Sequence, residues 1–71
     1  MKNANCPRFM VEFAGYVNKQ CAGLASWDYY GARIRKTVAS LEKGLISIDD
    51  AMRELVQISG DIRAEKESGV A

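Results

Sequence analysis

The chain has 71 residues, with ten basic and nine acidic side chains, two cysteines and no histidine. This length allows one domain with a small core, and a net charge of +1 neither requires nor forbids a polyanionic partner. Two cysteines are too few for a zinc site, which needs about four clustered ligands, and without histidine the usual proton-transfer group near neutral pH is missing.

Residues 7–43 have the apolar spacing of a helix. Alternate steps of three and four from Met10 to Leu45 pass through eleven positions, and nine of these are apolar. Pro7 stands in the first turn, where proline is favoured. Trp27 falls on the apolar seam, so we expect it in the core.

The sequence leaves open whether residues 7–43 form one long helix or two consecutive helices. Glycine inside a helix costs about 1 kcal/mol relative to alanine, so Gly15, Gly23 and Gly31 favour a break. Gly23 would end the first helix and Ser26 would cap the second. The unbroken apolar phase favours one helix, because a turn between helices seldom preserves register.

A helix end and a helix start follow within a few residues. Gly44 after Lys43 is typical of a helix terminus with a left-handed glycine. Ser47 is a good N-cap, and it is followed by Asp49 and Asp50, whose carboxylates favour the positive end of a helix. We predict a second helical segment over 47–66, with a flexible N-terminus at 1–6 and a frayed tail at 67–71.

The short loop predicts that the two helical segments run antiparallel as a helical hairpin, so the fold class is all-α with a single domain over 1–71. The charges fit this arrangement: residues 1–43 carry seven basic and three acidic side chains, whereas residues 44–71 carry three and six. We expect Arg33, Arg35 and Lys36 to lie beside Glu54 and Asp61.

The predicted C-terminal helix covers only about half of a helix as long as 7–43. A dimeric helical bundle is the commonest way to bury the remaining apolar surface, so we expect a homodimer. The residues predicted to mediate self-association are Phe9, Met10, Phe13, Tyr16, Val17 and Leu24.

An outward stripe of the middle segment is the second candidate surface. Its residues follow steps of four, three, four and three: Tyr29, Arg33, Lys36, Ser40 and Lys43. Tyrosine beside arginine is a pairing that protein interfaces favour, so we predict that Tyr29, Arg33 and Lys36 bind a protein partner. The alternative for Tyr29 is that it packs under a neighbouring helix of an oligomer. The basic stripe could also follow a phosphate backbone.

Catalysis is not expected, because no activating base can be named for Cys21 and no glycine-rich phosphate loop is present. Neither a cofactor nor a metal is expected, and Cys6 and Cys21 are predicted to be reduced in the cytoplasm. No apolar run is long enough for a membrane span.

The predicted function is that of a small helical protein that inhibits or adapts another protein, of the kind encoded by phages or mobile elements. The alternative is a small nucleic-acid-binding transcriptional regulator. Its weakness is that Asp49 and Asp50 begin the helix that would enter the major groove.

Overall fold

The computed structural model describes residues 6–68, which contain three α-helices and no strand. Helix α1 spans Arg8–Gln20, α2 spans Trp27–Glu42 and α3 spans Ile48–Ser68. The all-α prediction is confirmed, and the segment 7–43 forms two helices. Of the ends predicted to be flexible or frayed, 1–5 and 69–71 lie outside the described residues. Cys6 is buried, and α3 continues through Ser68.

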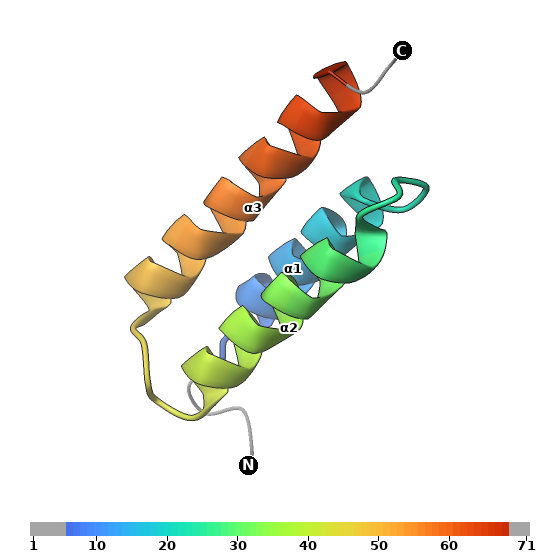
Figure 1. Ribbon diagram of the computed structural model, residues 1–71. Helices are drawn as coiled ribbons and strands as arrows, with labels where there is room; N and C mark the ends of the chain where they lie inside the picture. The colour runs from blue at the N-terminus through green and yellow to red at the C-terminus, as the bar shows by residue number, and fades with distance from the viewer. Residues whose placement is uncertain (1–5, 69–71) are drawn as a thin grey trace.

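The three helices pack side by side, and each touches both of the others. Consecutive helices run in opposite directions, so α1 and α3 point the same way while α2 returns alongside them (Figure 1). The apolar side of α1 is therefore covered by α2 and α3, and the half-covered long helix that the sequence also allowed is not present.

The connection between α1 and α2 is a series of tight turns over 21–26. The N–H groups of Cys21, Leu24 and Trp27 each donate to the carbonyl three residues earlier, at 3.3, 3.1 and 3.1 Å. Gly23 has a φ of 93°, which an L side chain rarely adopts. Ser26 occupies the N-cap position of α2, but its side chain makes no capping hydrogen bond.

The connection between α2 and α3 has the two features that the sequence predicts. Gly44 has a φ of 76°, and its N–H donates to the Leu41 carbonyl at 3.0 Å. The N–H of Leu45 donates to the Ser40 carbonyl at 2.9 Å, which completes a Schellman motif. At the start of α3, the Asp50 N–H donates to Ser47 Oγ at 3.1 Å, as expected of an N-cap.

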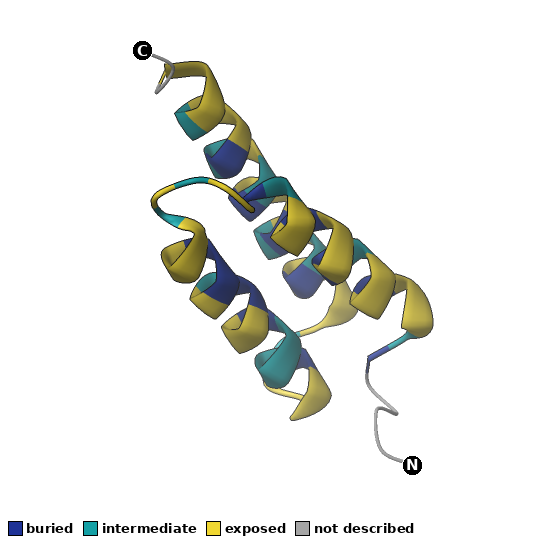
Figure 2. Cartoon of the chain, turned by 90° about the vertical axis from the view of Figure 1, so that its right-hand side faces the viewer, coloured by how far each residue is buried: buried dark blue, intermediate teal, exposed yellow. Residues whose placement is uncertain are grey.

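The core is formed by apolar side chains from all three helices. In Figure 2 the buried residues lie on the sides of the helices that face one another. They are Cys6, Met10, Ala14, Val17, Cys21, Tyr30, Ile34, Leu41, Ala51, Leu55, Ile58 and Ile62. None of the described helices is long and apolar enough to cross a membrane.

Trp27 is not in the core, which contradicts the sequence prediction: its side chain is 58% exposed. It is the first residue of α2 and follows directly on the 21–26 connection, whose residues Ala22, Gly23 and Ala25 are also exposed. At this end of the bundle no helix covers the ring.

Candidate functional site

Helices α1 and α3 form an open groove of about 330 Å³ along one side of the bundle. The groove is lined by Phe13, Tyr16, Val56, Ser59, Gly60 and Arg63. The rings of Phe13 and Tyr16 stack with their centroids 6.4 Å apart and their planes 15° apart. Ser59 Oγ donates to Gln20 Oε1 at 2.7 Å and so joins the last residue of α1 to α3.

Large apolar side chains stand exposed in and beside this groove. Phe9 is 52% exposed, Tyr16 58% and Val56 57%. Gly60 adds open space, because a Cβ built on it would meet no atom within 4 Å. The α1/α3 groove therefore offers aromatic ridges beside a glycine on a helix.

The residues predicted to mediate self-association divide into three groups. Phe9 and Tyr16 are exposed, whereas Phe13 and Leu24 are partly buried against the core. Met10 and Val17 are 0% exposed, so the expectation that they form a self-association surface is wrong. They face α2 and α3 because α1 packs in a three-helix bundle and not as half of a long helix.

From the sequence, Gly60 indicates either the close approach of another helix or a local bend, but no binding surface was predicted on α3. Val56 and Gly60 are four residues apart, so they lie on one side of α3, next to the buried stripe of Leu55 and Ile58. The sequence feature that could have indicated this surface is Val56, an apolar residue that flanks the apolar stripe of α3 without belonging to it. Whether Val56 lines a groove depends on where α1 packs, which the apolar spacing does not specify.

Of the three residues of the second predicted surface, two are exposed and the third, Arg33, is bonded to α3. Tyr29 is 60% exposed and Lys36 is also exposed. Arg33 instead reaches α3, where Nη1 donates to Asp61 Oδ2 at 2.9 Å and Nη2 donates to Glu54 Oε2 at 3.0 Å. Its guanidinium carbon also lies 5.7 Å from the centroid of the Tyr29 ring. Of the three basic residues expected beside Glu54 and Asp61, Arg33 makes the contact, whereas neither Arg35 nor Lys36 forms an ion pair with these carboxylates.

The contacts between α2 and α3 shift the pKa values of the groups that make them. The hydrogen bonds to Asp61 and then to Glu54 raise the pKa of Arg33. The same bond from Arg33, followed by one from Gln57, lowers the pKa of Asp61. Tyr30 donates to Glu65 Oε1 at 2.9 Å, and this bond together with burial raises the pKa of the phenol. Arg33 and Tyr30 are therefore groups that hold α2 to α3.

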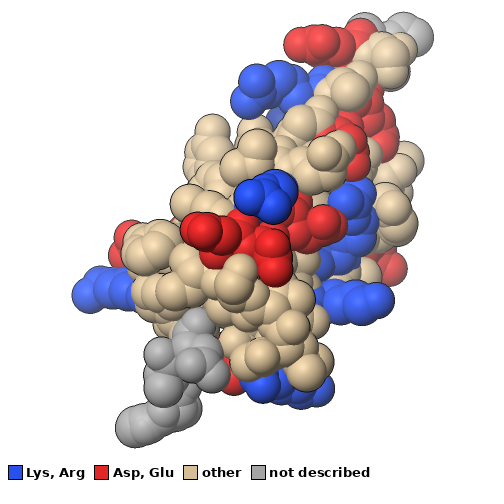
Figure 3. Space-filling model, turned by 90° about the vertical axis from the view of Figure 1, so that its left-hand side faces the viewer, with Lys and Arg blue, Asp and Glu red and all other residues tan. Residues whose placement is uncertain are grey.

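Charges of both signs are mixed on the surface. On the face in Figure 3, acidic side chains gather at the centre, and basic side chains lie among and around them. A basic stripe suited to a phosphate backbone would need a continuous positive surface. Since Arg33 is paired with two carboxylates, the predicted α2 stripe does not provide one.

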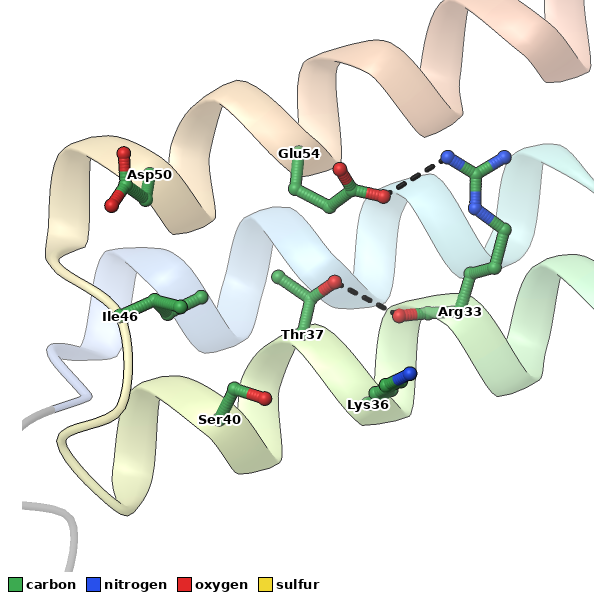
Figure 4. Close-up of a pocket in the computed structure, with 7 residues that line it drawn as sticks. All are labelled: Arg33, Lys36, Thr37, Ser40, Ile46, Asp50 and Glu54. Atoms are coloured by element: carbon green, nitrogen blue, oxygen red, sulfur yellow. Dashed lines mark hydrogen bonds and ion pairs between the residues drawn. The ribbon is translucent and has the colours of Figure 1, made fainter.

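A cleft of about 430 Å³ lies between α2, α3 and the loop that joins them. Figure 4 shows its lining of Arg33, Lys36, Thr37, Ser40, Ile46, Asp50 and Glu54. Thr37 is buried and donates its hydroxyl to the Arg33 carbonyl at 2.9 Å, so it needs no ligand. Within residues 6–68 no buried side-chain nitrogen or oxygen lacks a partner. Among its charged lining residues, Arg33 and Glu54 pair with each other at 3.0 Å, whereas Lys36 forms no ion pair within residues 6–68.

The two cysteines are free and buried near opposite ends of α1. Burial, and then the carboxylate of Glu42, raises the pKa of the Cys6 thiol. Cys21 Sγ donates to the Asn18 carbonyl at 3.1 Å. Both thiols serve as small core side chains, and in the described part of the chain no group of three His, Cys, Asp or Glu residues could hold a metal ion.

The α1/α3 groove is the strongest candidate for function, because it combines exposed aromatic rings with open space above a helical glycine. No family model matches the chain, and neither a curated protein nor a solved structure is similar to it.

Proposed function

We propose that this protein acts by binding another protein, which it inhibits or adapts, and that it catalyses no reaction. The observation that carries the proposal is the apolar α1/α3 groove with Tyr16 and Val56 exposed in it. At about 200 Å² for each aromatic side chain, the exposed parts of Phe9 and Tyr16 alone present on the order of 200 Å² to water. With Val56 this approaches the patches of about 300–600 Å² that often have a function on small proteins.

The shape of the groove favours an amphipathic helix of the partner as its occupant. Helices α1 and α3 form its walls, and Gly60 has no side chain that would keep a helix of the partner away. An incoming helix places apolar residues three and four positions apart into such a groove. Homodimer formation belongs to the same proposal, since a second copy offers apolar helices of this kind.

Nucleic-acid binding is the weaker alternative. Arg33 forms ion pairs with Glu54 and Asp61. Lys36 and Lys43 are therefore the exposed cations of the predicted basic stripe. We expect neither duplex nor single-stranded nucleic acid to bind with the steep salt dependence that several phosphate contacts produce.

The test is affinity capture from the native cell with the wild type and the Val56→Asp variant. A carboxylate in the groove should abolish capture, because it would have to be desolvated against an apolar helix. Ala32→Asp is the matched control: Ala32 is exposed on α2, so we expect this variant to capture the same proteins as the wild type. Circular dichroism should give the same helicity for all three. If Val56→Asp retains the wild-type partners, the groove is not the binding site.

A further inference from the structure

The outer side of α1 carries four residues that neither other helix covers: Glu12, Gly15, Tyr16 and Lys19. Their spacing of three, one and three places them on one side of the helix, opposite the buried Met10, Ala14 and Val17. This outer face thus has an anion in its first half, a cation in its second half, and a large ring beside a glycine between them.

We propose that two copies of the chain pair through this outer face, with their α1 helices antiparallel about a two-fold axis that passes between residues 15 and 16. The inference rests on the proposed function, because it names a second copy as the partner on the α1 side of the apolar surface. A two-fold interface uses the same patch twice, so every contact that it makes occurs in duplicate.

Charge complementarity determines the direction of pairing. An antiparallel arrangement brings Glu12 of each copy opposite Lys19 of the other, whereas a parallel one brings Glu12 opposite Glu12 and Lys19 opposite Lys19. Lys19 makes no ion pair within residues 6–68. Glu12 accepts from Arg8 Nε at 3.1 Å, but its side chain stays 66% exposed and can approach a second cation.

The register that pairs these charges also gives Tyr16 a place to pack. The pairs 12 with 19 and 15 with 16 are both centred midway between residues 15 and 16. Residues 15 and 16 lie about 100° apart around the helix, on opposite sides of the contact line, so the two-fold axis brings Tyr16 beside Tyr16 of the other copy and Gly15 beside Gly15 of the other copy. A Cβ on Gly15 would meet no atom within 4 Å of its own chain. Nothing in the single copy therefore requires glycine at this exposed helical position, where alanine would be the better helix former. Close approach of the two helix backbones at Gly15 accounts for it.

The available area sets the strength of the pairing. A standard interface buries about 800 Å² on each partner, which is about a sixth of the 4744 Å² surface of this chain. The 13 residues of α1 extend over only about 20 Å. Phe9 and Val11, 52% and 49% exposed, widen the face on either side. Since small interfaces are typical of weak, transient complexes, we expect a dissociation constant on the order of micromolar or weaker.

Sedimentation velocity from about 1 µM to about 1 mM, with circular dichroism on each sample, tests the pairing. We expect the wild type to pass from monomer to dimer in this range. Glu12→Lys and Lys19→Glu each replace two attractive contacts by two repulsive ones, so each should raise the dissociation constant at least about fivefold. The double variant Glu12→Lys/Lys19→Glu restores both pairs and should return to within about twofold of the wild type. Glu67→Lys, the same reversal on an exposed residue of α3, is the matched control and should leave it unchanged.

The double variant separates this geometry from others, because in a parallel pair it would again bring like charges together. A wild type that stays monomeric, single variants that dimerise like the wild type, or a double variant without recovery would each overturn the proposal. If α1 pairing fails in this way while Val56→Asp still abolishes capture of a partner, the proposed function stands without it. If the charge pattern holds but Val56→Asp captures the wild-type partners, the α1 pairing stands and the groove is not the binding site.

Discussion

Arg33 on α2 and Asp61 on α3 are 28 positions apart in the chain, yet their side chains meet at 2.9 Å. The same guanidinium donates to Glu54 at 3.0 Å, so one cation bridges two carboxylates that lie about two turns apart on the same side of α3. We expect Arg33→Met to lower the free energy of unfolding by about 1 kcal/mol, because it leaves two like charges near each other at a partly exposed site. Urea denaturation measures this. Lys36→Met removes a charge from an exposed residue of the same helix that has no ion pair within residues 6–68, and it should have no comparable effect.

The same ion pair predicts how stability depends on pH in acid. The pKa of Asp61 is lower in the folded protein than in the unfolded chain, chiefly because Arg33 donates to its carboxylate. Its contribution to stability is therefore complete above the unfolded pKa of about 4 and is lost as the pH falls through the lower folded value. Urea denaturation at several pH values below about 5 should show a steeper loss of stability for the wild type than for Arg33→Met. Equal slopes would mean that the contact does not persist in solution.

Tyr30 combines a buried ring with a hydroxyl that donates to Glu65. Tyr30→Phe keeps the ring but removes the hydrogen bond, so it should lower the free energy of unfolding by about 1 kcal/mol. The raised pKa of Tyr30 also predicts that the wild type loses stability as the pH rises beyond about 10, since a phenolate cannot donate to Glu65. The variant should lack this alkaline loss. Tyr29→Phe is the matched control, because Tyr29 is exposed. This variant should keep both the wild-type free energy of unfolding and the wild-type loss of stability at alkaline pH.

Tyr29 tests the second candidate surface, in which it stands beside the ion-paired Arg33 and the exposed Lys36. Tyr29→Ala should leave helicity unchanged and cost less than about 1 kcal/mol of stability, because 60% of the side chain is exposed. If this surface binds a partner, the variant should lose that partner in affinity capture, and Tyr29→Phe should retain it. Unfolding of Tyr29→Ala would show instead that the ring supports the fold.

Local chemistry made the helix boundaries around Gly44 and Ser47 predictable, since the left-handed glycine and the capping serine act within one turn of the chain. The pairing of Arg33 with α3 followed from the charge asymmetry of the two halves. The reversal at 21–26 was one of two alternatives open from the sequence, because Gly23 and Ser26 indicated a break while the apolar pattern continues across it.

Errors about individual side chains came from that ambiguity. In a long helix, Met10 and Val17 would be free for a second copy, but in the three-helix bundle they are core. Periodicity shows which side of a helix is apolar and does not show which helix covers it. Trp27 adds a second limit: a residue on the apolar side of the sequence pattern can still be exposed in the first turn of its helix.

The burial of Cys6 just before α1 and of Cys21 just after it gives the molecule two native reporters of local opening. A thiol-modifying reagent reaches a buried sulfur only when the surrounding structure opens, so the modification rate divided by that of the same thiol in the unfolded chain gives the free energy of that opening. Equal opening free energies at the two cysteines, below that of global unfolding, would mean that α1 detaches as a unit. Unequal values would mean that the two ends of the bundle open independently.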